Sequence, residues 1–139
     1  MIFIIYRILR ESHLCSQIHK MIIYKIFHFD SAHYLPHVPK GHKCGGMHGH
    51  TYTVKISISG QPGIETGWIM DYTDIKKTIK PFIALLDHQV LNTVTGLENP
   101  TSENLCLWLW KKIKPEIPDL CRIELNETPE SGVIYEGKS

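Results

Sequence analysis

The stretch from His48 to Gly60, HGHTYTVKISISG, indicates the fold more clearly than any other part of the chain. Apolar or histidine side chains alternate with polar ones along it, a pattern that predicts a half-buried antiparallel strand. His48 and His50 lie on the apolar face at its beginning. Because alternate residues of a strand point to the same side, about 6.5–7 Å apart, both imidazoles can bind one zinc ion.

The preceding stretch, Ile22 to Tyr34, is rich in β-branched and aromatic residues and predicts a second strand. If it pairs with the first across the loop of residues 35–47, His33 lies close to both other histidines. Three histidines would leave the fourth position of a tetrahedral zinc open, which is the mark of a catalytic site. The competing ligands are His28, which points to the opposite face, and His37 and His42, which lie in the loop.

Two helices and two further strands are predicted downstream. Asp71 is placed to cap a helix that extends to Leu86, and Pro81 within it is expected to kink or restart the helix. Thr101 caps the second helix, and the closing strands are residues 120–126 and 132–135. The order β-β-α-α-β-β predicts an α+β domain, a four-stranded antiparallel sheet with two helices on one face.

The length of 139 residues predicts one domain, which we expect to occupy residues 21–139. We expect residues 1–20 to be an extension outside it, from an early start codon, because Met21 directly precedes the first strand pattern. The apolar run at residues 1–9 is too short to span a membrane. The formal net charge of +1 gives no electrostatic argument for binding nucleic acid or an anionic membrane.

The four cysteines form no C-x-x-C pair, which argues against a structural zinc ribbon or a thioredoxin-like motif. Their wide spacing favours reduced thiols and therefore a cytoplasmic location. Cys106 and Cys121 fall in predicted elements and are interpreted as small core residues.

Three further groups are candidates for chemistry, and each has an ordinary alternative. Cys44 follows a lysine and precedes two glycines. The lysine and a nearby metal would both favour the thiolate form of Cys44, and the alternative is an exposed loop thiol without a role. Asp87 can orient His88 as an acid or base, although a histidine at a helix end is common. Glu127 can bind a guanidine-like edge through two hydrogen bonds, or be a solvated turn carboxylate.

Six short motifs occur in order between residues 22 and 137. They are FDSAH at 29–33, HVPKGHKCGGMHGH at 37–50, GWIMD at 67–71, LDHQVLN at 86–92, ENPTSE at 98–103 and ET at 127–128. Together these motifs resemble the 6-pyruvoyl tetrahydropterin synthase family. One of them alone would be a weak match, whereas six in sequence are specific; residues 1–20 have no counterpart.

The resemblance implies the tunnelling fold (T-fold), in which trimers close their sheets into a barrel. Two trimers then stack into a homo-hexamer with active sites at the subunit interfaces. Zinc is the implied cofactor, and the implied ligands are His33, His48 and His50.

The same resemblance implies the roles of the other site residues. Cys44 is the implied catalytic thiolate, and Asp87 and His88 are its implied partner pair. For the pterin substrate, Glu127 is implied to hold the amino-pyrimidine edge, with Thr101 and Ser102 near the pocket.

The three residues between Cys44 and His48 favour the branch of the family that acts in queuosine biosynthesis. That branch implies conversion of 7,8-dihydroneopterin triphosphate to 6-carboxy-5,6,7,8-tetrahydropterin, with release of acetaldehyde and triphosphate. One alternative is 6-pyruvoyl-tetrahydropterin synthase activity on the same substrate. Another is a non-catalytic zinc- or pterin-binding module, against which the joint presence of Cys44, Asp87 and His88 argues.

Overall fold

The computed structural model of this protein describes residues 20–137. The extension predicted at residues 1–20 therefore lies outside the described part of the chain, except for Lys20. Within residues 20–137, no helix has both the length and the apolar character needed to cross a membrane.

The fold is built on one mixed sheet with the strand order β3-β1-β2-β4-β5. The strands are β1 (Met21–His33), β2 (His48–Gly60), β3 (Gln89–Val90), β4 (Leu120–Thr128) and β5 (Ser131–Tyr135). The four predicted antiparallel strands are present, but the predicted count of four is wrong because β3 adds a fifth. β3 pairs in parallel with the end of β1, and with two residues it is too short to leave a sequence pattern.

Two helices, α2 (Tyr72–Ala84) and α3 (Ser102–Ile113), begin at the predicted caps. The Asp71 side chain accepts a hydrogen bond from Thr73 N at 2.6 Å, and Thr101 accepts one from Asn104 N at 3.2 Å. Of the two expected effects of Pro81, a kink or a restart, the restart does not occur, because α2 continues through this residue. Pro81 is exposed, so water can hydrogen-bond the carbonyl that its missing N–H leaves free.

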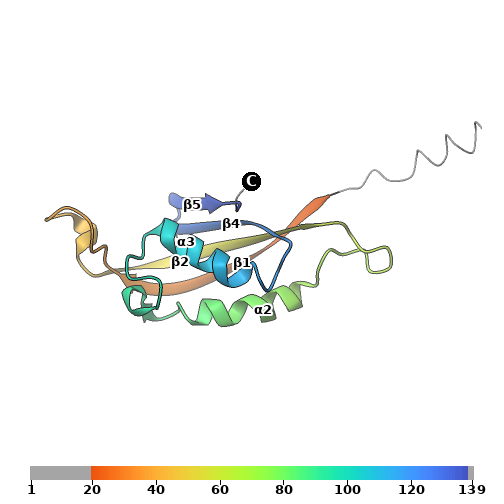
Figure 1. The fold of residues 1–139 in the computed structure, drawn as a ribbon, viewed down its shortest axis with the longest axis horizontal. Coiled ribbons are helices and arrows are strands. Elements are labelled where there is room, and N and C mark those ends of the chain that lie inside the picture. The colour runs from red at the N-terminus through yellow and green to blue at the C-terminus, as the bar shows by residue number, and fades with distance from the viewer. Residues whose placement is uncertain (1–19, 138–139) are drawn as a thin grey trace, which may run out of the picture.

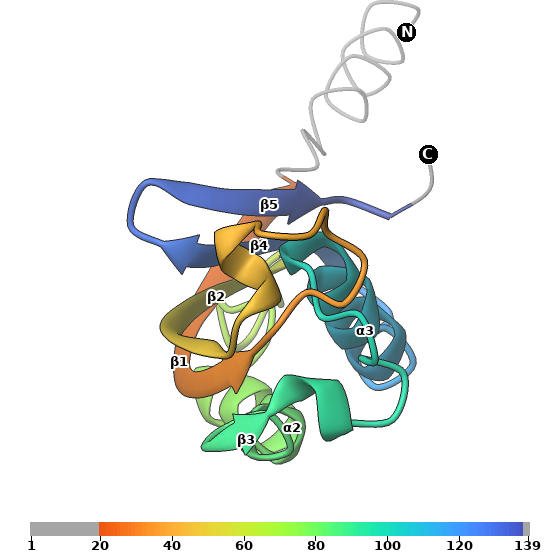
Figure 2. The ribbon, with the colours of Figure 1, turned by 90° about the vertical axis from the view of Figure 1, so that its left-hand side faces the viewer.

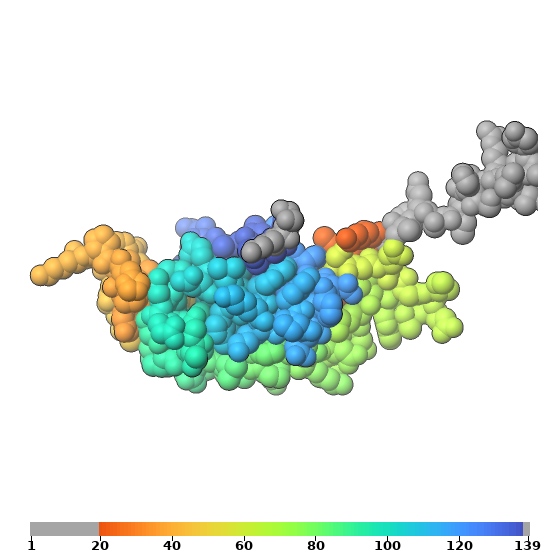
Figure 3. Space-filling view, in the orientation of Figure 1, coloured from red at the N-terminus to blue at the C-terminus, as the bar shows by residue number. Residues whose placement is uncertain are grey.

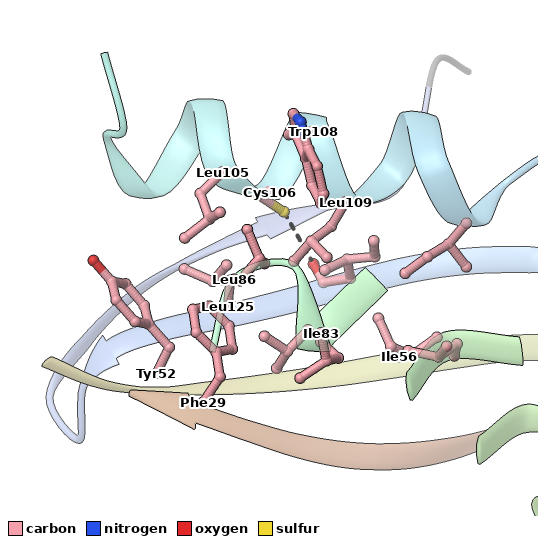
Figure 4. Close-up of a cluster of buried hydrophobic side chains, with 14 of the residues drawn as sticks. Phe29, Tyr52, Ile56, Ile83, Leu86, Leu105, Cys106, Trp108, Leu109 and Leu125 are labelled. Atoms are coloured by element: carbon pink, nitrogen blue, oxygen red, sulfur yellow. Dashed lines mark hydrogen bonds between the residues drawn. The ribbon is translucent and has the colours of Figure 1, made fainter. Parts of the chain in front are cut away.

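Both helices cover the same face of the sheet, and the core lies between (Figures 1 and 2). The inward residues of β2 are almost fully buried against isoleucines of α2 and leucines of α3. Figure 4 shows this cluster, including Cys106, whose thiol donates to the carbonyl of Ile123. Cys106 is fully buried, which confirms its interpretation as a core residue, and this burial raises the pKa of its thiol to about 12.

The opposite face of the sheet is left uncovered by the helices. It exposes several large apolar side chains, namely Ile22, Tyr24, Ile26 and Ile134. The loop between β1 and β2 includes a short 3₁₀ turn, Lys43–Gly45, and projects from one end of the molecule (Figures 1 and 3). The predicted histidine ligands lie at that same end, where β1 finishes and β2 begins.

Candidate active site

Strand pairing brings three of the predicted histidines together. In the β1–β2 register, His33 lies opposite His48 and Ser31 lies opposite His50. The Nε2 atoms of His33 and His48 are 3.1 Å apart. The cluster is on the helix-covered side of the sheet, and His33 is only 1% exposed. Pairing of these strands across the 34–47 loop is therefore sufficient to bring the three imidazoles to one point.

Backbone carbonyls fix the orientation of two of these rings. His33 Nδ1 lies 2.9 Å from the carbonyl oxygen of Pro100, and His48 Nδ1 lies 2.8 Å from that of Gly46. Since a carbonyl oxygen only accepts, each Nδ1 is the protonated donor. Each Nε2 then presents its lone pair to the cluster, which is the arrangement seen around metal-bound histidines.

The third ring supplies a test of whether the cluster fits a metal. His50 Nε2 is buried and makes no hydrogen bond within the described residues, although Glu127 Oε1 lies 3.1 Å from it. Burial is also the largest influence on its imidazole and lowers the pKa of His50, which favours the neutral, metal-binding form. A buried nitrogen without a hydrogen bond is unfavourable unless something binds it. The donor set therefore fits a divalent cation, and neutral imidazoles with a carboxylate suit zinc.

Glu127 belongs to the same cluster. Its Oε1 lies 3.1 Å from His33 Nε2 and 3.1 Å from His50 Nε2. The hydroxyl of Ser102, at the beginning of α3, donates to its other oxygen, Oε2, at 3.1 Å. Glu127 lies within β4 on the side of the buried Leu125, and not in the turn as the sequence indicated.

Tyr52 closes the buried side of the cluster. It is fully buried, and its hydroxyl lies 3.4–3.5 Å from the two ring nitrogens of His33. Burial, followed by the charge of Glu127, raises the pKa of Tyr52, so that it remains a neutral phenol. The sequence placed Tyr52 on the histidine face but gave no reason to link it to the site.

Cys44 lies in the projecting loop and is partly exposed. Its carbonyl accepts from Leu35 N at 2.8 Å, and its N–H donates to His42 Nδ1 at 3.1 Å. These bonds fix the backbone beside the thiol. The Cys44 sulfur is not among the four donor groups that lie within 4.8 Å of one another in the histidine cluster.

Asp87 and His88 follow α2 in a turn and form a side-chain pair. His88 Nδ1 lies 3.0 Å from Asp87 Oδ1, and the His88 side chain is 77% exposed. His88 has φ = 56°, the only positive φ of a non-glycine residue among residues 20–137. Such a backbone is uncommon for a residue other than glycine, and residues of this kind cluster at functional sites.

Asp30 holds this pair in place, a role that sequence reasoning missed. Its backbone N–H donates to Asp87 Oδ1 at 3.0 Å, and its carbonyl accepts from His88 N at 2.7 Å. Its carboxylate accepts from Thr51 Oγ1 at 2.5 Å. The N–H of Asp30, and then His88, lower the pKa of Asp87, which keeps that carboxylate ionised. The interaction joins residues 57 positions apart, so no local pattern could have indicated it.

The Asp87–His88 pair and the histidine cluster lie on different sides of β1. Asp30 and His33 are three positions apart on the strand and project from opposite faces. His88 lines a pocket of about 570 Å³ together with Asp30 and Thr51, and His50 of the histidine cluster also lines it. Asp30, Asp87 and His88 form one group of donor atoms within 4.8 Å of one another, and this group is separate from that of the histidine cluster.

The other two predicted substrate residues have partners within the chain. The Thr101 hydroxyl is the cap of α3, and the Ser102 hydroxyl is bonded to Glu127. Ser102 is therefore part of the histidine cluster's surroundings, whereas Thr101 has a clear structural role at this position.

The fold, the histidine cluster and the Asp87–His88 pair together are typical of one class of protein. Residues 22–138 match the family described as 6-pyruvoyl tetrahydropterin synthase, and the chain belongs to that family. This agrees with the resemblance carried by the six motifs.

Individual relatives make the likeness more specific. The chain is 38% identical over 120 residues to the 6-carboxy-5,6,7,8-tetrahydropterin synthase of Synechocystis sp., covering 82% of this chain and 92% of that protein. It is 35% identical to the dihydroneopterin monophosphate aldolase of Pyrococcus furiosus, covering 83% and 96%. The structure of Caenorhabditis elegans 6-pyruvoyl tetrahydropterin synthase superposes with a TM-score of 0.80 over 88% of this chain and 99% of that one, at 22% identity. This structural likeness supports the predicted T-fold.

Proposed function

We propose that this protein is a zinc-dependent lyase that converts 7,8-dihydroneopterin triphosphate to 6-carboxy-5,6,7,8-tetrahydropterin, releasing acetaldehyde and triphosphate, in queuosine biosynthesis. The observation that carries the proposal is the convergence of His33, His48 and His50, among which the buried His50 Nε2 makes no hydrogen bond. The likeness to the Synechocystis sp. enzyme supports the choice of product. The family match begins at residue 22, which supports a domain of residues 21–139.

The three histidines would hold the zinc, with their rings oriented by the Pro100 and Gly46 carbonyls. When bound, zinc supplies a Lewis acid that polarises the hydroxyl groups of the substrate side chain. Glu127 would accept two hydrogen bonds from the amino-pyrimidine edge of the pterin and so orient the side chain. Ser102 would keep that carboxylate in position, because it already donates to Oε2.

Cys44 and His88 would move the protons. The Cys44 thiol is partly exposed on a loop that begins and ends beside the histidine cluster, so it can reach a side chain bound there. Asp87 holds the His88 ring through Nδ1, which leaves Nε2 free to give or take a proton. Acid–base groups on two sides of the substrate side chain can exchange protons between its carbon and oxygen atoms.

The second copy of the chain is part of this proposal. Because the Asp87–His88 pair is on the uncovered face, the pair from one copy would meet the cluster and Cys44 of another. Exposed apolar residues on the same face, including Ile22, Tyr24 and Ile26, support burial against other copies in a homo-hexamer. A cytoplasmic location remains a prediction from the wide spacing of the cysteines.

Product analysis tests the proposed reaction. Purified zinc-loaded protein is incubated with 7,8-dihydroneopterin triphosphate, and the pterin products and acetaldehyde are measured by liquid chromatography with mass spectrometry. We expect 6-carboxytetrahydropterin and acetaldehyde in equal amounts. A 6-pyruvoyl product without acetaldehyde would show the sister activity, and lack of turnover would favour a binding module.

The aldolase relative provides a second candidate, since it covers most of the chain at 35% identity. Dihydroneopterin monophosphate is therefore included as an alternative substrate. Preferred cleavage of the monophosphate would contradict the proposed reaction. In the same assay His50→Ala should lose turnover, because it removes a proposed zinc ligand, and His28→Ala is its matched control, because His28 is a histidine of the neighbouring strand that lies on the other face.

A further inference from the structure

Glu127 lies close enough to the histidine nitrogens to bind the same metal ion, in addition to its proposed role as a substrate anchor. The donor atoms of the cluster lie close together. His33 Nε2 is 3.1 Å from His48 Nε2, and Glu127 Oε1 is 3.1 Å from both His33 Nε2 and His50 Nε2. In a tetrahedral zinc site with bonds of about 2.0–2.1 Å, adjacent donor atoms are about 3.3–3.4 Å apart. Oε1 therefore stands where a fourth ligand would stand.

The charge of the Glu127 carboxylate also has to be stabilised by a cation nearby. Among residues 20–137, no lysine or arginine nitrogen lies within 4.0 Å of this carboxylate, and its nearest basic nitrogens are the Nε2 atoms of the neutral His33 and His50 rings. Its side chain is 27% exposed, so water only partly solvates it. Ser102 holds Oε2, which directs Oε1 at the imidazole nitrogens. A part-buried carboxylate aimed at three histidine nitrogens is best stabilised by a metal ion among them.

The same carboxylate cannot serve both of its roles at once. An Oε1 that is bound to a metal has no lone pair free in the right direction for a bidentate bond to a guanidine-like edge. Occupation of the fourth position also closes the metal to a substrate hydroxyl. The two roles therefore have to alternate.

We propose that Glu127 is a two-position carboxylate. Without substrate it is the fourth ligand of the metal and keeps the site closed. When a pterin ring arrives, Glu127 leaves the metal for the amino-pyrimidine edge, and this opens the fourth position for the side-chain hydroxyls. The second half of this inference rests on the proposed function, whereas the first half concerns the metal alone.

The metal half is tested without any substrate. Zinc affinity is measured by chelator competition for the wild type, Glu127→Gln and Glu124→Gln. Glu124 is the matched control, because it is a glutamate of the same strand that pairs with Lys55 on the opposite face. We expect zinc binding to weaken about tenfold or more in Glu127→Gln and to be unchanged in Glu124→Gln. Equal affinity in all three proteins would overturn the fourth-ligand role.

The switching half uses cobalt(II) as a visible probe in place of zinc. A 7,8-dihydropterin without side-chain hydroxyls is added, since it can fill the ring pocket but cannot bind the metal through a side chain. We expect the cobalt absorption bands to change in the wild type and in Glu124→Gln, and to stay constant in Glu127→Gln. Thermal melting of each variant verifies that it is folded.

Two results would overturn the switch in different ways. If the pterin binds, as measured by calorimetry, and the wild-type cobalt spectrum does not change, the switch is wrong while the proposed substrate class stands. If the pterin does not bind at all, both the switch and the proposed function fail. The zinc-affinity result is independent of either outcome.

Discussion

At the scale of single residues, the backbone of Asp30 controls the candidate acid–base pair. Its N–H donates to the Asp87 carboxylate, and its carbonyl accepts from His88 N. The turn that carries this pair is also held to β1 by a hydrogen bond from the Ser31 hydroxyl to the Leu86 carbonyl. The strained φ of His88 is thus maintained by contacts with a rigid strand. An imidazole held in this way would lose little conformational freedom if substrate binds beside it.

Replacement of Asp87 by asparagine should reduce turnover about a hundredfold or more, because an amide cannot stabilise a protonated His88. Asparagine retains an oxygen that can accept from Asp30 N–H, so the fold should be preserved. Steady-state kinetics measure the effect, with Asp74→Asn, an exposed aspartate on α2, as control. Turnover equal to that of the wild type would exclude Asp87 from the mechanism.

The stability of the same variant should depend on pH in a defined direction. The folded-state pKa of Asp87 is lowered below its ordinary value of 3.8, so its ionised form stabilises the fold. That contribution is present above pH 3.8 and is lost as the pH falls through the folded pKa. We therefore expect the melting temperature of Asp87→Asn to be below that of the wild type at pH 7, with a smaller difference near pH 2.5. A difference that grows in acid would contradict this assignment.

The cysteines should differ strongly in reactivity. Cys106 is fully buried with a pKa of about 12, so only about one molecule in 10⁴ carries its thiolate at pH 8. Cys44 is partly exposed in the loop. Brief treatment of the native protein with iodoacetamide, followed by peptide mass spectrometry, should therefore label Cys44 and spare Cys106. Labelling of Cys106 at a similar rate would show that α3 opens easily.

At the scale of elements, the site depends on where strands and helices end. The histidines come from the end of β1 and the beginning of β2, Glu127 from the end of β4, and Ser102 from the first turn of α3. Side chains at the ends of elements can approach one another while the elements themselves remain regular. The regular parts supply rigidity, and the loops at the same end supply access.

Sequence alone could predict those features that have a local cause. Period-two alternation located β2 between His48 and Gly60, and the Asp71 side chain marked the beginning of α2. In contrast, β3 exists only because two residues pair with the end of β1. The Pro100 carbonyl beside His33 is likewise a contact across 67 positions, which no local pattern encodes. The residue types of the site were thus predictable, whereas the groups that orient them were not.

The β4–β5 hairpin should be sensitive at Gly132, which pairs with Asn126 next to the end of β4 that carries Glu127. A Cβ at Gly132 would overlap the Leu125 carbonyl oxygen and lie 2.8 Å from Asn126 Nδ2. Since the backbone cannot yield without loss of strand pairing, Gly132→Ala should lower the free energy of unfolding by about 1–3 kcal/mol. Urea denaturation measures this, and Gly46→Ala, whose Cβ would meet nothing closer than 3.7 Å, should be nearly neutral.

At the scale of the whole molecule, the two faces of the sheet have different functions. The covered face contains the core and, at its end, the histidine cluster. The uncovered face carries exposed apolar side chains and the pocket lined by His88. Under the proposed roles of Cys44 and His88, a second copy would bring the groups of the two faces together.

Mixed assemblies test this division directly. Cys44→Ala and His88→Ala should each be inactive alone, but a site that takes Cys44 from one copy and His88 from another is intact in some mixed oligomers. In a random one-to-one mixture, about one quarter of such sites contain both native residues. Co-expression with two different tags, tandem purification and the product assay should therefore recover about a quarter of wild-type turnover. If both groups of a site came from the same chain, every site would lack one of them, and the mixed assemblies would be as inactive as their parents.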